Sequence, residues 1–427
     1  MRQLINNKYL IPFFIVFWFF TIIGSSLYIG STMLSIRNLL FPFLFVLIYT
    51  LRGVKLNKKQ FIIFLPIGLL FLYGTISLLF IGNTNLEVIK DYFYFSFVPT
   101  LFVSIILLSN KFKLDFFDIM NKYSYYFLYF LFSITLFEFF TDIHLAVHTP
   151  NRFHIPSAFF TNANDLSVVV IQLFMLISIL KKRTDPQWKY TLAFVLTTFI
   201  VFITLSRLAL VAFIIISIFI LLSKSFRWKD LIINIIVISL SLLYLSIDLP
   251  TAKTSSTVVD RSKTRISSMT EIDYGSFEST EESIGNTSIE FDNHGDTVVS
   301  STHVRLDIYK IPLRNPEKFI FGYGFNSDKQ VITKYKTLPY KIINSHSYFI
   351  QLIFYFGWIG LTLMLLFFGV LGYYSIINLK QWAFFLPVIF TQALLLNIPS
   401  SVMRFPLVWI PFFIAIAYYT NLNKKIK

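Results

Sequence analysis

The sequence lacks cysteine and contains few charged residues. Among 427 residues, 14% are Asp, Glu, Lys or Arg, whereas soluble chains average about 25%. Without cysteine the chain can form no disulfide, thiolate metal site or cysteine nucleophile. A P-loop, a GxGxxG turn and an HExxH helix are also missing, and the six histidines form no ligand cluster. These absences predict no metal and no cofactor, and they imply that any enzymatic substrate arrives already activated.

The sequence is rich in apolar residues, which form long blocks. Hydrophobic residues make up 56% of the chain, and its mean hydropathy is +0.68. The apolar residues gather in blocks such as 9–28 and 61–81 rather than recurring at helix or strand period. A block of about 20 apolar residues can cross a bilayer core as a helix, whereas a soluble core helix would keep a polar face. The composition therefore predicts an all-α polytopic membrane protein.

The pattern predicts about twelve membrane spans. No cleavable signal is evident, so the first apolar block is interpreted as the first membrane helix. The tenth span is longer than a bilayer requires, and its first part could lie in the interface before the chain turns inward at Gly357–Gly360. The predicted spans are 9–29, 33–51, 61–81, 88–109, 123–141, 166–181, 189–204, 208–223, 230–248, 347–377, 382–398 and 405–421.

The distribution of Lys and Arg predicts the orientation of these spans. With the amino terminus inside, the inner segments hold 20 Lys and Arg residues, and the short outer segments hold five. Short cytoplasmic loops are enriched in these residues, so both termini are predicted to be cytoplasmic. The net charge is +15, and most of the basic residues lie in short loops at helix ends. Because this placement is explained by membrane orientation, nucleic acid is not an expected partner.

One large loop, about 249–345, is predicted to lie outside, between spans nine and ten. Residues 249–300 are polar and rich in Ser, Thr, Asp and Glu, which predicts a mobile segment. Residues 301–345 have helix-like apolar spacing and a turn marked by Pro and Gly, which predicts a folded part. The chain thus divides into 1–248 with spans one to nine, the loop at 249–345, and 346–427 with the last three spans.

Arg207 interrupts an otherwise apolar stretch, FITLSRLALVAF. It could be a turn residue whose side chain reaches the outer headgroups. It could also bind an anion, because a guanidinium grips phosphate oxygens with two hydrogen bonds. An arginine on the outer face opposes the charge bias of the other helix ends, and such charges are functional candidates. We therefore favour an anion site.

Arg305 lies in the part of the loop that is predicted to fold. Taken alone, it reads best as a solvated loop charge, and Arg314 and Lys318 compete with it for any anion-binding role. His346 stands where the loop meets the tenth span. It could be an interfacial or capping residue, or a general base or hydrogen-bond donor to substrate, because imidazole titrates near neutrality.

The stretch FTNAND precedes the sixth span and contains Asn162 and Asn164. Asn and Asp are ordinary helix caps, but these side chains could also hydrogen-bond a sugar or a phosphate. Arg152 and His154 lie in the same predicted outer segment, and Arg404 lies in another. The sequence leaves both readings open.

The order of these features resembles the O-antigen ligase and O-antigen polymerase superfamily of bacterial membrane glycosyltransferases. FTNAND before a span, Ser-Arg at the outer end of a helix, Arg305 followed by RNPEKFIFGYGF, and His346 opening a span with FGWIG appear in the family's order across about 160–360. The family commonly has Asn after this histidine, whereas this chain has Ser347. That departure puts in doubt any role that the Asn side chain would play.

The resemblance implies transfer of a glycan from undecaprenyl diphosphate to a hydroxyl group outside the cytoplasmic membrane, with no metal or nucleotide. Arginines such as Arg207 and Arg305 would then neutralise the leaving diphosphate. His346 would orient or deprotonate the acceptor, with Asn162, Asn164, Arg152 and Arg314 as lesser contacts. The implied product is a surface polysaccharide of capsule or O-antigen type. Partners would be the lipid-linked glycan, membrane lipid, and a flippase and chain-length regulator of the same pathway.

Other functions remain open at this point. A ligase that moves finished polymer to a lipid or wall acceptor would share donor and motifs with a polymerase. A transporter such as a lipid-linked oligosaccharide flippase would suit the twelve spans, but the loop of roughly 95 residues and the absence of internal repeats argue against it. A sensor or scaffold lacks a recognisable cytoplasmic output module.

Overall fold

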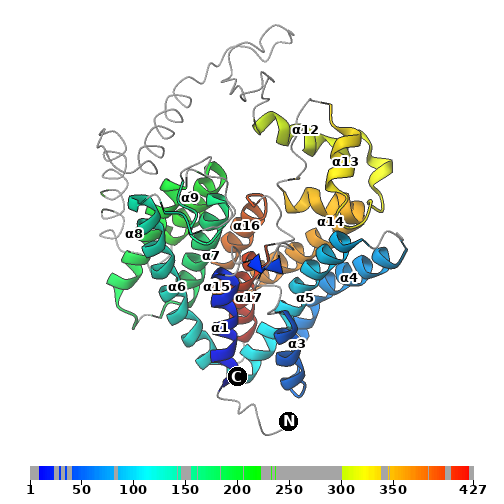
Figure 1. Ribbon diagram of the computed structural model, residues 1–427. Coiled ribbons are helices and arrows are strands. Elements are labelled where there is room, and N and C mark those ends of the chain that lie inside the picture. The colour runs from blue at the N-terminus through cyan, green and yellow to red at the C-terminus, as the bar shows by residue number, and fades with distance from the viewer. Residues whose placement is uncertain are drawn as a thin grey trace.

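The apolar blocks fold into helices that pack side by side, as the computed structural model shows (Figure 1). In chain order the bundle contains α1 (Leu10–Ile23), α3 (Phe41–Thr50), α4 (Lys58–Phe80), α5 (Leu86–Phe112), α6 (Leu114–Thr141), α7 (Ala163–Leu180), α8 (Gln187–Ile203), α9 (Arg207–Leu222), α14 (Tyr348–Ile377), α15 (Leu379–Trp382), α16 (Phe385–Leu395), η4 (Pro406–Trp409) and α17 (Ile410–Leu422). Two-residue strands β1 (Tyr28–Ile29) and β2 (Leu34–Ser35) pair antiparallel after α1.

The structure describes residues 9–23, 28–29, 34–35, 41–80, 85–141, 143–145, 155–160, 162–182, 184–204, 206–222, 232, 236, 301–337, 345, 347–382, 384–399 and 405–422. Within them, the segment 301–337 forms α12 (Ser301–Arg314), the 3₁₀ helix η3 (Pro316–Phe319) and α13 (Asp328–Tyr335). The predicted mobile stretch 249–300 lies outside the described residues.

Eleven of the twelve predicted spans overlap a described helix. The match is incomplete in the first two spans, where residues 28–29 and 34–35 form strands and α3 covers only 41–50 of the predicted 33–51. Of the remaining span, 230–248, only residues 232 and 236 are described. Five helices, α4, α5, α6, α7 and α14, are long and apolar enough to cross a membrane. The remaining spans correspond to shorter apolar helices of 10–17 residues. The fold is therefore that of a helical membrane protein, and the number of spans and their orientation stay predictions.

The centre of the bundle is formed by α5, α7 and α17, whose side chains are mostly buried. The peripheral helices, in contrast, present large apolar side chains on their outward faces, including Leu72 on α4 and Leu365 on α14. In a soluble protein such a surface would be unfavourable, whereas in a bilayer it meets lipid.

The connections divide the bundle into two ends. Short turns join α5 to α6 and α7 to α8 at one end, which we call the basic end. There Lys182 Nζ lies 2.6 Å from Asp118 Oδ2, and Gln60 Nε2 donates to Asn110 Oδ1 at 2.9 Å. This end holds Arg52, Lys55, Lys58, Lys59, Lys111, Lys113, Lys122, Lys181, Lys182 and Lys189.

The opposite end holds the connections α4–α5, α6–α7 and α8–α9, together with the start of α14. The 301–337 segment lies at this end, in yellow in Figure 1, beside the first part of α14. The predicted inner and outer sides correspond to the basic end and the opposite end, respectively.

A kink at Gly357 joins α14 to the 301–337 segment. Gly357 has φ 66° and ψ −164°, so the helix is interrupted there, as the sequence predicts for Gly357–Gly360. The interruption leaves carbonyl groups of the preceding turn available. Tyr323 N donates to Phe354 O at 2.8 Å, and Gly324 N donates to Tyr355 O at 3.0 Å. The kink is therefore one of the places at which the segment is hydrogen-bonded to the bundle.

Candidate functional site

Three elements meet at the opposite end: α12, the start of α14 and the end of α16. Ser347 caps α14, and its Oγ donates a hydrogen bond to Asn397 Oδ1 in the turn after α16. The next residue, Tyr348, donates its backbone N–H to Leu396 O at 3.0 Å. Two consecutive residues of α14 are thus fixed to the end of α16.

The third element contributes Tyr309 and Arg305 from successive turns of α12. The Tyr309 hydroxyl lies near the Ser347 side chain and near the charge of Arg305. Burial raises the pKa of Tyr309 above its ordinary value of 10.0, and the Arg305 charge and the nearby Ser347 hydroxyl oppose this only in part. At neutral pH Tyr309 is therefore a neutral hydroxyl beside a cation, an arrangement that can donate hydrogen bonds to an anionic or sugar oxygen.

His346, the proposed base, lies outside the described residues. The residues on either side of it are described, and both are buried: Ser345 is 1% exposed and Ser347 is 4% exposed. Ser347, directly after position 346, contacts Asn397. The role of His346 as the base therefore stays a prediction from the sequence.

Arg207 is the first residue of α9, and its side chain is exposed. Helix α9 follows the turn after α8 and packs against α16 and α7, which places Arg207 at the same end as Asn397. The buried Ser206 precedes it, and its carbonyl accepts the backbone N–H of Leu210 at 2.9 Å. Arg207 is thus held at a helix start while its guanidinium stays accessible.

In FTNAND, Asn162 acts as the cap of α7. Its Oδ1 accepts the backbone N–H of Asn164 at 2.9 Å, which fits the capping interpretation. The side chains of Asn162 and Asn164 are half-buried, so both retain access to the opposite end. Arg152, His154 and Arg404 lie outside the described residues.

Arg314 points into an ion pair rather than into the cluster around Ser347. Its Nη1 lies 2.9 Å from Oδ1 of Asp307, which is about two turns earlier on the same face of α12. The same Nη1 lies 3.3 Å from Thr337 Oγ1. Asp307 Oδ2 also accepts the backbone N–H of Thr337 at 2.9 Å. Arg314 thereby ties α12 to the residue that follows α13, which makes a structural role its simplest explanation.

Glu138, at the end of α6, was not singled out from the sequence. It is fully buried, and its Oε2 accepts the N–H groups of Ser157 at 2.8 Å and Ala158 at 2.7 Å. Its Oε1 accepts the N–H of Leu145 at 2.8 Å. One carboxylate thus holds both ends of the connection that leads into FTNAND. In the sequence, the only feature that could have indicated this role is an acidic residue within an apolar block, close to the predicted end of the helix.

A second cluster of acids joins the 301–337 segment to the bundle. The Tyr355 hydroxyl lies 2.9 Å from Asp91 Oδ2 on α5 and 3.0 Å from Asp328 Oδ2 at the start of α13. Gln351 Nε2 donates to Asp328 Oδ2 at 3.1 Å. Nevertheless, no group of three His, Asp or Glu side chains suited to a metal ion occurs in the described part of the chain.

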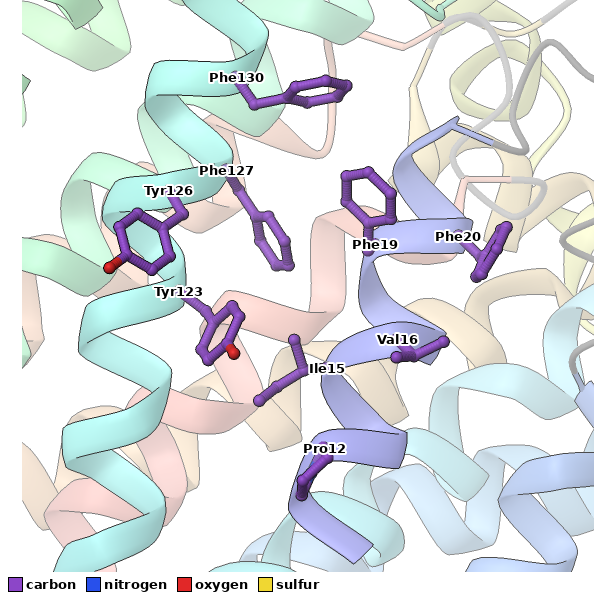
Figure 2. Close-up of a pocket in the computed structure, with 9 residues that line it drawn as sticks. All are labelled: Pro12, Ile15, Val16, Phe19, Phe20, Tyr123, Tyr126, Phe127 and Phe130. Atoms are coloured by element: carbon purple, nitrogen blue, oxygen red, sulfur yellow. The ribbon is translucent and has the colours of Figure 1, made fainter. Parts of the chain in front are cut away.

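An apolar groove of about 400 Å³ opens between α1 and α6 (Figure 2). Phe19 of α1 faces Phe127 and Phe130 of α6, with ring centroids 5.8 and 5.4 Å away, respectively. The Phe130 ring stacks on Phe159 at 5.7 Å, three residues before Asn162, so aromatic contacts lead from the groove to the opposite end. Its full lining is Pro12, Ile15, Val16, Phe19, Phe20, Tyr123, Tyr126, Phe127 and Phe130.

Comparison with known families gives one match. A family model described as O-antigen ligase matches residues 192–365, from within α8 to within α14. The matched region contains Arg207, Arg305, Ser347 and the kink at Gly357, whereas Asn162 and Asn397 lie outside it. The match supports a membrane enzyme that transfers glycosyl groups. A search of curated proteins gives no match.

Proposed function

We propose, from the match of residues 192–365 to a family model described as O-antigen ligase, that the protein polymerises lipid-linked oligosaccharide repeats. The donor would be a glycan on undecaprenyl diphosphate, and the product a capsule or O-antigen type polysaccharide on the outer face of the cytoplasmic membrane. The observation that carries this proposal is the meeting of Arg305, Tyr309, Ser347 and Asn397 at the end of the bundle opposite the basic end.

In this reaction the acceptor hydroxyl oxygen would attack the anomeric carbon of the donor sugar. A new glycosidic C–O bond forms while the C–O bond to the diphosphate breaks, and the diphosphate leaves with that electron pair. His346 would take the hydroxyl proton, and the configuration at the anomeric carbon would invert. One base and a stabilised leaving group are sufficient for this displacement, because the diphosphate carries the activation.

The arginines would neutralise the charge that develops on the leaving diphosphate. Guanidinium groups suit this role because they bind phosphate oxygens with two parallel hydrogen bonds and stay charged at any physiological pH. Arg305 would act from α12 and Arg207 from the start of α9. The neutral Tyr309 hydroxyl would contribute a hydrogen bond without adding charge.

The polyprenyl chain of the donor needs an apolar path beside the site. The groove between α1 and α6 is lined by aromatic and aliphatic residues, and the Phe130–Phe159 contact links it to the connection that carries Asn162. This supports a lipid-linked donor rather than a soluble one.

The proposal is tested with purified protein in detergent, supplied with lipid-linked repeat units. Extension to longer lipid-linked chains, read by mass spectrometry, supports a polymerase. Arg207→Ala, Arg305→Ala and His346→Ala should each abolish extension at normal protein abundance, whereas Lys329→Ala on the exposed face of α13 should not. If all three variants still make long chains, the mechanism is wrong.

The reaction products also distinguish a polymerase from a ligase and from a flippase. Transfer of preformed polymer to a lipid or wall acceptor, without extension of repeats, would identify a ligase. In cells, loss of a polymerase leaves single repeat units, whereas loss of a ligase leaves long carrier-linked polymer. Because detergent provides no closed membrane, extension under these conditions would exclude flipping as the sole activity.

A further inference from the structure

The 301–337 segment exposes large apolar side chains next to the helix bundle. Leu313, at the end of α12, is 65% exposed, Ile320 is 46% exposed and Phe321 is 66% exposed. We call Leu313, Ile320 and Phe321 the apolar tip. Leu306, seven residues before Leu313 on α12, is also 47% exposed, whereas Ile308, Phe319 and Val331 are buried. The segment therefore has a buried apolar side and an exposed apolar side.

Contacts with α4 and α14 locate the apolar tip on the flank of the bundle. Tyr73 of α4 donates its hydroxyl proton to Phe321 O at 3.1 Å. Trp358 of α14 donates from Nε1 to Pro316 O at 3.1 Å. Figure 1 shows this part of the segment beside α14 and above α4.

The same helices face lipid where they meet the tip. Leu72, the neighbour of Tyr73, is 54% exposed, as is Leu365 farther along α14. Tyr and Trp side chains whose rings pack against apolar surface and whose polar atoms reach outward are typical of the membrane–water interface. Tyr73 and Trp358 fit this description, with their polar atoms bonded to the backbone of the 301–337 segment. The tip thus continues an apolar surface that begins on the membrane helices.

The charge of the segment also fits a lipid surface. Residues 301–337 contain five Lys and two Arg against two Asp and one Glu. Asp307 is buried against Arg314 and Thr337, and Asp328 contacts Tyr355. Lys318, between Leu313 and Ile320 in the sequence, is exposed, and its ammonium lies over the Tyr335 ring. An exposed lysine at this position adds positive charge that attracts anionic lipid heads.

We propose that the apolar tip, Leu313, Ile320 and Phe321, is inserted into the outer leaflet of the bilayer, at the boundary between headgroups and acyl chains. The occupant of this surface is therefore membrane lipid, and the 301–337 segment is an interfacial element rather than a domain surrounded by water. Its kinked attachment at Gly357 and its lipid contact hold it from two sides. This inference does not depend on the reaction that the protein catalyses.

The chain offers a clean experiment because it has no cysteine. Phe321→Cys and Leu313→Cys are labelled with an environment-sensitive fluorophore in the full-length protein, reconstituted into phosphatidylcholine and phosphatidylglycerol vesicles. Leu72→Cys on α4 is the lipid-exposed control, and Lys329→Cys on the exposed side of α13 is the aqueous control. Quenching is measured with nitroxide lipids labelled near the headgroup or near the chain end, and with a water-soluble quencher.

We expect both tip labels to show blue-shifted emission and strong quenching by nitroxide near the headgroup, approaching that at Leu72→Cys. The water-soluble quencher should act strongly only at Lys329→Cys. Water-like emission at both tip positions would overturn the proposal. Blue-shifted emission without lipid quenching would also overturn it, because another part of this chain, such as 249–300, or a second copy would then cover the tip. Thermal unfolding of each labelled variant checks that the fold is intact.

Discussion

Ser347 donates a hydrogen bond to Asn397, a residue 50 positions away that ends the turn after α16. This bond and the Tyr348–Leu396 backbone bond fix the chain directly after position 346. The family that the sequence resembles commonly has Asn after the histidine, whereas this chain has Ser347, whose hydroxyl contacts a carboxamide in the turn after α16. A carboxamide is thus present beside position 347, although it comes from a residue distant in sequence.

We expect Asn397→Ala to reduce glycan extension by roughly tenfold. A single hydrogen bond contributes about 0.5–1.5 kcal/mol, and 1.36 kcal/mol corresponds to tenfold in rate. Because the bond positions the chain beside the proposed base, kcat should fall more than KM rises. Asn378→Ala is the matched control. The side-chain amide of Asn378, like that of Asn397, donates to the carbonyl one turn earlier, here Tyr374 O at 2.8 Å, but Asn378 lies at the basic end. Equal losses in both variants would argue against a positioning role.

Gly357→Ala should be strongly destabilising. A Cβ at this position would overlap Ile320 O, and the positive φ of 66° disfavours any L side chain. Gly369→Ala, on the same helix with open space around its Cα, should be neutral or stabilising by up to about 1 kcal/mol. Thermal unfolding in detergent distinguishes the two, and a Gly357→Ala protein as stable as wild type would contradict the described kink.

Glu138→Ala should disorder the connection between α6 and α7. Three backbone N–H groups would lose their acceptor, and a hydrogen bond to a charged group is worth about 1.5–3 kcal/mol. Proteolysis between residues 142 and 160 should accelerate, and the apparent stability should fall. Glu87→Ala removes an exposed acid paired with Lys90 at 3.6 Å and should change neither.

Tyr309→Phe tests the neutral hydroxyl at the site. Because burial raises the pKa of Tyr309, its protonated form is favoured by folding. The protonated Tyr309 hydroxyl therefore contributes to folding stability. This contribution is complete below about pH 10, the ordinary pKa of tyrosine, and is lost as the pH rises through the higher pKa that Tyr309 has in the folded state. Removing the hydroxyl should therefore lower the extension rate without moving the pH profile between pH 6 and about pH 9. A displaced profile in that range would identify Tyr309 as a titrating group.

The sequence predicts the helices well because each span is a local property of its apolar block. The break in α14 was also foreseeable, since Gly357 and Gly360 interrupt a block longer than a bilayer requires. The pairing of Arg314 with Asp307 could have been found too, because residues seven apart lie on one face of a helix. For these features, the local order of residues is sufficient for the prediction.

The candidate site was predicted only as a set of separate residues. Ser347 with Asn397, and Tyr355 with Asp91 and Asp328, join residues that are distant in sequence. Such pairs depend on how helices pack, which the period of apolar residues does not determine. Glu138 was missed for the same reason, because its partners are backbone N–H groups and leave no trace in side-chain composition.

The hydrogen bonds at the α14 kink also determine how motion could occur during turnover. Tyr323 and Gly324 are bonded to the carbonyls of Phe354 and Tyr355, and Ser327 Oγ donates to Phe354 O at 3.2 Å. The first turns of α14 and the 301–337 segment are therefore coupled on one side of Gly357, and Ser347 belongs to this unit. Because Ser347 and Tyr348 are also bonded to Asn397 and Leu396, any movement that separated the unit from the end of α16 would have to break both bonds.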